Sequence, residues 1–201
     1  LYVGEPVRVG SLAVPPAVAW VASSPLLTVL IYFGAFFGLQ AARRVRGVNV
    51  AALIGFTFLS GLFLAPALFI ANLSAAAGHT LSAHPVRDAF VLASTGFGGL
   101  TAYAFVTKKD FSFLGGMLSM GLWVLLGAML LGMFVGGQVF QLAIASVGVL
   151  LFGAYVLYNT SQLLRDDQVS SPIDAAITLY LNFLNLFIFL LQILSSNRRG
   201  D

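Results

Sequence analysis

Apolar residues occur along this chain in long, nearly continuous stretches, separated by short segments that hold most of the charged residues. A helix needs about 20 apolar residues to cross the hydrocarbon core of a bilayer, whereas the strands of membrane barrels alternate in polarity. The pattern predicts helices at about residues 25–42, 48–77, 89–107, 111–135, 139–164 and 173–194. We therefore expect an all-α, polytopic membrane helical bundle that forms a single integral membrane domain over residues 1–201.

The segment before the first predicted helix has a different character. Leu1–Gly4 has the sequence expected of the end of a truncated helix, and the chain does not begin with Met. Pro6 and Pro15–Pro16 predict a loop or a broken segment after it. Ser24 before Pro25 then predicts a helix start, because Ser caps helices and Pro fits the first helical position.

The last apolar stretch, Ile173–Leu194, carries a line of polar side chains. Their offsets of 0, +4, +7 and +14 place them on one helical face, and they are Thr178, Asn182, Asn185 and Gln192. Amide groups at membrane depth are costly unless they face protein or water. We therefore expect this face to point into the bundle.

The preceding predicted helix repeats the pattern with Tyr155, Asn159 and Gln162, at offsets of 0, +4 and +7. Two consecutive helices with inward amides indicate a polar seam inside an apolar bundle. Amides of this kind also serve as hydrogen-bonding contacts between membrane helices and nothing more. The periodicity alone leaves both interpretations open.

Composition places the chain among membrane proteins. It is 59% hydrophobic and 8% charged, with a mean hydropathy of +0.97, and soluble domains are far more charged. The net charge of +3 is spread over loops, so nucleic-acid binding is not indicated. The sequence has no cysteine, which excludes disulfides and thiolate metal sites.

The loops differ in basic charge from one side of the predicted bundle to the other. By parity, one side holds Arg43, Arg44, Arg46, Lys108, Lys109 and Arg165, and the other side holds Arg8 and Arg87. Cytoplasmic loops are enriched in Lys and Arg, so the first side is predicted to be cytoplasmic. Arg198 and Arg199 follow the last helix and would lie outside if it spans the membrane. Either that helix is re-entrant, or these late charges do not set the topology.

No Asp, Glu, Lys, Arg or His lies in the interior of any predicted span. Proton-coupled transporters need such groups at depth, and an intramembrane protease needs an activated nucleophile or paired carboxylates. Ser60 lies in the middle of a span, but His79 and His84 lie in a loop. We therefore expect no enzyme activity, no cofactor and no metal site.

Three segments carry a family resemblance. They are GFTFLSG at Gly55–Gly61, TKKDFSFLGGML at Thr107–Leu118, and Tyr155–Leu194 with YVLYNTSQLL and ITLYLNFLNLFIFLLQIL. Together they resemble the Bax inhibitor family, and most closely its bacterial members. The resemblance implies seven helices with a central last helix, the first helix being largely missing from this chain. It also implies a multi-pass protein of a bacterial cytoplasmic (inner) membrane.

The resemblance further implies function. Members are associated with passive calcium leak and with protection from cell death, and a bacterial branch with modulation of a membrane-anchored ATP-dependent protease of the FtsH type. In leak-type members two aspartates on the last two helices form a pH-sensing pair that gates a pore. The matching residues are Asn159 and Asn182, which keep the shape but cannot titrate. We expect their side chains to face each other, within reach of a direct hydrogen bond or of one bridged by a water molecule.

These amides shape the functional expectation. We expect a pH-insensitive passive leak of cations such as calcium through the seam, with Tyr155, Gln162, Thr178 and Asn185 supporting the pair. Amide and carbonyl oxygens can still coordinate calcium. The alternative is a non-conducting interaction partner that modulates a membrane protease. The expected partners are thus the lipid bilayer, calcium ions and such a protease.

Overall fold

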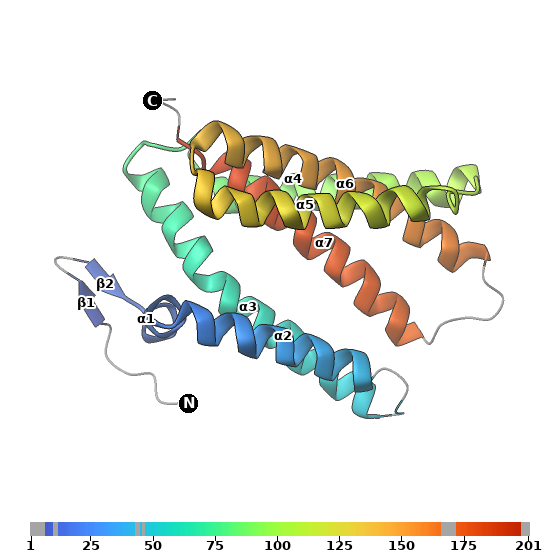
Figure 1. The fold of residues 1–201 in the computed structure, drawn as a ribbon, viewed down its shortest axis with the longest axis horizontal. Coiled ribbons are helices and arrows are strands. Elements are labelled where there is room, and N and C mark those ends of the chain that lie inside the picture. Colours follow the sequence, from blue (N-terminus) through green and yellow to red (C-terminus); the bar gives the residue numbers. More distant parts are fainter. Residues whose placement is uncertain (1–6, 10–11, 43–44, 46, 166–171, 198–201) are drawn as a thin grey trace. The chain divides into compact units, whose positions relative to one another are not determined.

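The computed structural model describes residues 7–9, 12–42, 45, 47–165 and 172–197 (Figure 1). The elements, in chain order, are β1 (Val7–Val9), β2 (Leu12–Val14), α1 (Pro16–Ser23), α2 (Pro25–Ala42), α3 (Val48–Ala76), α4 (Pro85–Thr107), α5 (Leu114–Val135), α6 (Gln138–Arg165) and α7 (Pro172–Leu194). Within the described residues, 5 helices, α3 to α7, are long and apolar enough to cross a membrane. The predicted all-α, polytopic membrane fold is confirmed.

The helix bounds follow the apolar stretches closely, with two local differences. Helix α2 begins at Pro25 as predicted, and the N–H of Thr28 donates to the carbonyl oxygen of Ser24 at 2.9 Å. Helix α4 begins at Pro85 rather than at residue 89, because Pro suits the first helical position. Helix α5 begins at Leu114 rather than at residue 111, after a turn.

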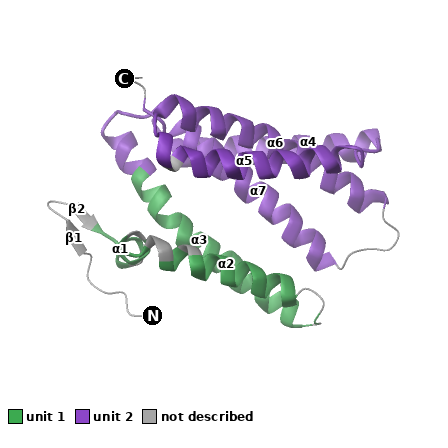
Figure 2. Ribbon diagram, viewed as in Figure 1, with its two compact units in different colours: residues 1–70 green, residues 71–201 purple. Residues whose placement is uncertain are grey.

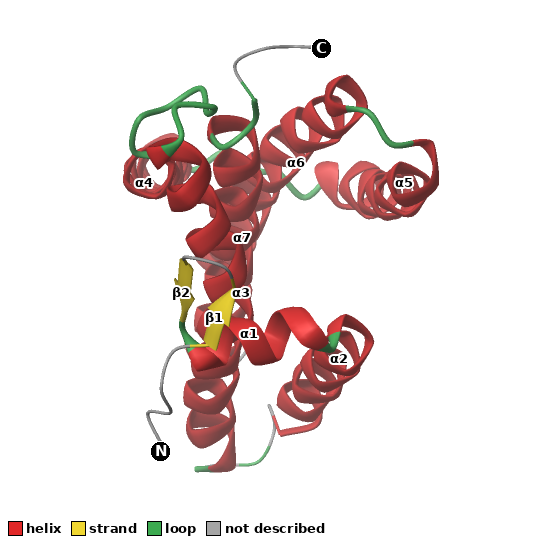
Figure 3. Cartoon of the chain, turned by 90° about the vertical axis from the view of Figure 1, so that its left-hand side faces the viewer, coloured by secondary structure: helices red, strands yellow, loops and turns green. Residues whose placement is uncertain are grey.

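The N-terminal segment is more regular than a loop. Strands β1 and β2 form a short antiparallel hairpin, and α1 follows at once (Figure 3). The junction between strand and helix falls at Pro15–Pro16, where the ring fixes the backbone and the missing N–H leaves no helical bond unmade. The sequence did not predict these elements, and Leu1–Gly4 lies outside the described residues.

The chain divides into two compact units, residues 1–70 and 71–201, which are described separately (Figure 2). In the first unit, aromatic rings join α2 to α3. The ring of Tyr32 lies 5.5 Å from that of Phe56 and 5.9 Å from that of Phe63, measured between centroids. Phe56 is buried by this contact. The single membrane domain over residues 1–201 stays a prediction.

In the second unit, α7 packs against both α4 and α6, which also pack against each other, while α5 packs against α6. The most apolar window of α7 is 33% buried, more than that of any other described candidate span. This agrees with the central last helix that the family resemblance implies. Aromatic rings supply much of the contact: Phe183 of α7 meets Phe97 of α4 at 5.7 Å between centroids.

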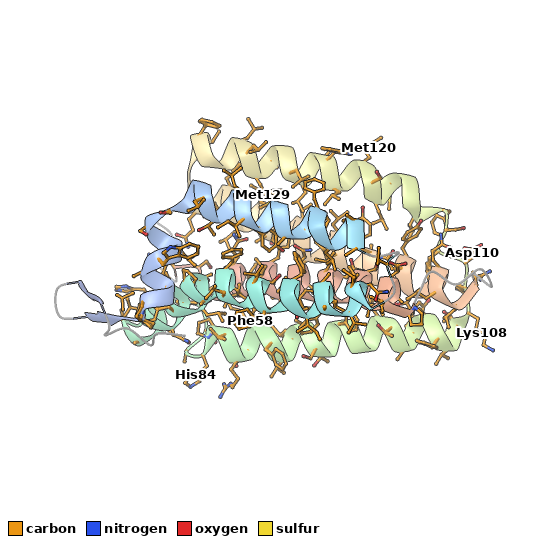
Figure 4. The ribbon with its side chains drawn as sticks, turned by 90° about the horizontal axis from the view of Figure 1, so that it is seen from below. Phe58, His84, Lys108, Asp110, Met120 and Met129 are labelled. Carbon is orange, nitrogen blue, oxygen red and sulfur yellow. The ribbon has the colours of Figure 1, made fainter. Side chains whose placement is uncertain are left out.

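The second unit has two distinct ends. At one end, Arg165 Nη2 donates to the carbonyl oxygen of Lys108 at 2.6 Å. At the other, the N–H of Leu81 donates to the carbonyl oxygen of Ser196 at 3.1 Å, beyond the end of α7. Figure 4 shows Lys108 at the opposite end of α4 from His84. We call these the Lys108 end and the His84 end.

The last helix runs from one end of this unit to the other. Contacts of Phe183 with Phe97 and of Phe187 with Phe90 show that α7 is antiparallel to α4. Its C-terminal end lies at the His84 end, beside the segment that precedes α4. Within this unit α7 is therefore one continuous helix, and its course through the membrane stays a prediction. The cytoplasmic side stays a prediction, and Arg43, Arg44, Arg46, Arg198 and Arg199 lie outside the described residues.

Candidate functional site between helices α6 and α7

The packing of α6 on α7 determines where Asn159 and Asn182 lie along the two helices relative to each other. The ring of Phe152 stacks on that of Phe189, with centroids 5.8 Å apart. Asn159 follows Phe152 by seven residues and Asn182 precedes Phe189 by seven. Seven residues are close to two helical turns, so each amide lies on the same helical face as its aromatic neighbour. Because the helices are antiparallel, this register brings both amides to one level, toward the Lys108 end.

Asn182 is deeply buried within this packing, with 5% of its surface exposed. Its Nδ2 atom has no hydrogen-bond partner among the described residues. A buried polar group left in this state costs about 1–3 kcal/mol. The amide nitrogen of Asn182 is therefore available to a water molecule or a polar solute.

Two hydroxyl groups in the described part of the chain also lack a hydrogen-bond partner. Thr160 of α6 is 2% exposed, and neither its Oγ1 nor that of Thr101 in α4 has a hydrogen-bond partner there. Helices α4, α6 and α7 all pack against one another. Each of the three thus contributes an unpaired polar atom to the interior of this unit.

Asn159 is half-buried on α6. Within the described residues, no hydrogen bond joins its side chain to that of Asn182. A direct bond was one of two forms in which we expected the pair to interact. The other form, a bridge through one water molecule, stays a prediction, as does the facing of the two side chains.

The supporting polar residues behave differently. Asn185 Nδ2 donates to the carbonyl oxygen of Leu181 at 2.8 Å, and Gln162 Nε2 donates to the hydroxyl of Tyr158 at 3.2 Å. Each of these bonds joins two residues of the same helix, α7 in the first case and α6 in the second. Tyr155 and Thr178 are half-buried. The amide nitrogen of Asn185 therefore has a partner in its own helix, whereas that of Asn182 has none among the described residues. The two residues nevertheless lie on the same predicted polar face of α7.

Sequence reasoning did not identify Thr160 or Thr101 as site residues. A hydroxyl in an apolar helix usually bonds a carbonyl of its own preceding turn, as Thr95 does with Val91 at 2.7 Å. A lone Thr therefore gives no signal of an unpaired hydroxyl. The adjacency of Thr160 to Asn159 was the one available hint.

A polar cavity of about 400 Å³ opens at the His84 end. Its lining includes the side chains of Gln138, Gln141, Gln192 and Ser195. Among the described residues, no group of three or more His, Cys, Asp or Glu is placed to hold a metal ion. A cation in this cavity would meet neutral amide, hydroxyl and carbonyl oxygens.

The fold and this polar packing define the chain as a multi-pass α-helical membrane protein, in whose second unit several buried polar atoms have no partner among the described residues. Residues 7–199 match the family model described as inhibitor of apoptosis-promoting Bax1. The chain belongs to the Bax inhibitor family. The resemblance drawn from the sequence motifs is thereby confirmed.

Several relatives share most of this chain. An uncharacterized protein of Campylobacter jejuni is 41% identical over 166 residues, which cover 83% of this chain and 69% of that protein. The Golgi anti-apoptotic protein of vaccinia virus (strain Lister) is 33% identical over 184 residues, covering 90% and 73%. Protein lifeguard 4 of the mouse is 32% identical over 180 residues, covering 88% and 71%.

Proposed function

We propose that this protein is a passive, pH-insensitive leak for cations such as calcium, with the path running between α6 and α7. The observation that carries the proposal is the buried Asn182, whose Nδ2 has no hydrogen-bond partner among the described residues. Polar groups buried in a membrane are costly, so one without a partner is a candidate for an ion or substrate pathway. A hydrated cation would satisfy this amide, since its oxygen binds the ion and its nitrogen donates to accompanying water.

The surroundings of the amide support a path of this kind. The polar cavity at the His84 end offers an entrance lined by glutamine side chains. Toward the Lys108 end, the buried hydroxyl of Thr160 follows on α6. Neutral amides and hydroxyls between these ends favour weak, transient cation contact, because a permeating ion has to leave as readily as it enters.

Insensitivity to pH follows from the chemistry of the pair. Asn159 and Asn182 stand where the leak-type members of the family are expected to carry aspartates, and an amide does not titrate. Asp88 and Asp174 lie in the first turns of α4 and α7, away from the middle of those helices. The proposed activity involves no catalysis and no cofactor.

The family membership supports a role in membranes and leaves the choice of partner to experiment. Relatives named as anti-apoptotic or lifeguard proteins occur in a virus and in the mouse, and others occur in Campylobacter and Helicobacter. The bacterial relatives support a place in the cytoplasmic membrane of a bacterium. The resemblance also connects a bacterial branch with an FtsH-type protease, and this non-conducting role is the alternative that the flux experiment decides.

Asn182→Leu should reduce calcium uptake into liposomes that contain the purified protein by at least tenfold. The substitution removes the one amide of α7 that is both buried and unpaired among the described residues. The midpoint of thermal unfolding should stay the same or rise, because an unpaired buried polar group costs about 1–3 kcal/mol. Uptake is measured with an indicator dye enclosed in the liposomes.

The matched control is Asn185→Leu. It changes the same residue type in the same helix, but its amide already bonds the carbonyl oxygen of Leu181. Uptake should stay within twofold of the parent protein. Equal loss in both variants would contradict a specific role for Asn182. Absence of uptake from the parent protein would contradict the leak and favour the protease-modulator function.

A further inference from the structure

A cavity of about 470 Å³ lies at the Lys108 end of the second unit, between the last turns of α4 and α6. Its lining consists of Phe105, Lys108, Lys109, Ser161, Leu164 and Arg165. Three of these side chains are cationic and two are apolar. This combination has no part in the path proposed for cations, which basic side chains would repel.

The cationic wall of this cavity, formed by Lys108, Lys109 and Arg165, is held in place by contacts with α6. Arg165 Nη2 donates to the carbonyl oxygen of Lys108 at 2.6 Å, and Arg165 Nη1 lies 3.7 Å from Asp110 Oδ2. The hydroxyl of Ser161 donates to the carbonyl oxygen of Lys109 at 3.1 Å and accepts from the N–H of Phe111 at 3.2 Å. The backbone that carries both lysines is therefore fixed against the neighbouring helix.

The turn that carries the two lysines leaves both of them exposed. Lys108 ends α4 in the left-handed region, with φ of 49°, and its N–H donates to the carbonyl oxygen of Ala104 at 3.1 Å. This conformation is uncommon for residues other than Gly and is kept here by the contacts with α6. Figure 4 shows Lys108 and Asp110 together at this end of the molecule.

Among the described residues, the charge of the cavity is positive on balance. Asp110 is the acidic side chain paired with Arg165, and hydrogen bonds from Ser112 hold the pKa of its carboxyl group below the usual value. Lys108 and Lys109 are exposed and form no ion pair with a described residue. Two cations thus remain uncompensated within the described part of the cavity.

The apolar part of the cavity decides what kind of anion fits. Phe105 is 53% exposed and Leu164 is 42% exposed, and both lie at the ends of helices that are long and apolar enough to cross a bilayer. Lysine side chains at such positions extend their charged groups to the membrane surface. A free phosphate would contact the cationic wall alone, whereas a lipid would fill both parts of the cavity.

We propose that this cavity binds the headgroup phosphate of an anionic phospholipid, with the acyl chains lying along Phe105 and Leu164. Basic pockets between membrane helices are suited to anionic headgroups. The guanidinium of Arg165, already fixed by its two partners, and the ammonium groups of the two exposed lysines supply the donors. This inference is independent of the proposed leak.

The test compares lipid binding to the parent protein and to Lys108→Gln/Lys109→Gln by native mass spectrometry. Phosphatidylglycerol should bind the parent protein, and phosphatidylcholine with the same acyl chains should bind at least fivefold less. The double variant should lose at least fivefold of its phosphatidylglycerol binding. The control is Arg87→Gln, which removes a cation at the other end of α4 and should change binding less than twofold.

A third variant tests the same site in the opposite direction. Asp110→Asn removes the carboxylate that faces Arg165 and should raise phosphatidylglycerol binding at least twofold, a gain that loss of folding cannot produce. Equal losses in the lysine variant and in Arg87→Gln would overturn the proposal, since net charge alone would then explain binding. Competition by inorganic phosphate at millimolar concentration would overturn the lipid as the ligand.

Discussion

Gly148→Ala should lower the midpoint of thermal unfolding of the purified protein by several degrees. A Cβ atom at this position would lie 2.6 Å from the Cγ atom of Phe189 and equally close to a second ring atom. The base of the ring cannot swing away, because Phe189 is 4% exposed and stacks on Phe152. Overpacking of this kind costs about 1–3 kcal/mol.

The expected shift follows from that free energy. A change of 1 kcal/mol moves the midpoint by roughly 2–4 °C in a chain of this size. The better helix propensity of Ala offsets up to about 1 kcal/mol. Unfolding is followed in detergent by circular dichroism or by a fluorescent dye.

Two further variants separate the clash from other effects. Gly98→Ala in α4 meets nothing within 4 Å and should keep or raise the midpoint. Adding Phe189→Leu to Gly148→Ala should restore part of the lost stability, because the smaller side chain leaves room for the new methyl group. An unchanged midpoint for Gly148→Ala would show that α6 and α7 are not packed as closely as described.

Asn159→Asp combined with Asn182→Asp should make calcium uptake depend on pH, with a rise of at least tenfold between pH 5 and pH 8. Each Asp starts from a reference pKa of about 3.9, which burial and the neighbouring carboxyl raise. When protonated, the two groups share a hydrogen bond and attract no cation. When ionised, they repel each other and favour a cation between them, so uptake increases as pH rises.

The two carboxyl groups should titrate as a coupled pair, in two macroscopic steps. Asn185→Asp is the matched control, because it places a carboxylate on α7 one turn from Asn182 and outside the pair. Its uptake should vary less than threefold over the same range. A flat profile for the double variant would contradict the pairing of Asn159 with Asn182 across the two helices.

Particular residues show how much of the fold the sequence predicts. The start of α2 at Pro25 was predictable, since Ser followed by Pro before an apolar stretch is a local signal. The start of α4 was placed too late because Arg87 and Asp88 lower the local hydropathy of its first turn. The hairpin of β1 and β2 was missed because strands of three residues are too short for their periodicity to be read.

The sequence predicts which helical face carries the polar side chains of the candidate site. It does not predict which of their polar atoms have hydrogen-bond partners. Asn182 and Asn185 lie on the same face of α7, yet Asn185 bonds its own helix and Asn182 does not. The difference depends on the side-chain rotamer and on what packs beside each amide. Burial of Thr160 likewise results from the contact of α6 with its neighbours, which the local sequence does not contain.

Calcium uptake by the unmodified protein, measured in liposomes between pH 5 and pH 8, tests the central claim most directly. The account predicts uptake well above that of protein-free liposomes, with a rate that varies less than threefold across the range. Asn159 and Asn182 do not titrate there, and no Asp, Glu, Lys, Arg or His lies midway along α6 or α7. Uptake equal to that of empty liposomes, or a rate that changes tenfold with pH, would contradict it.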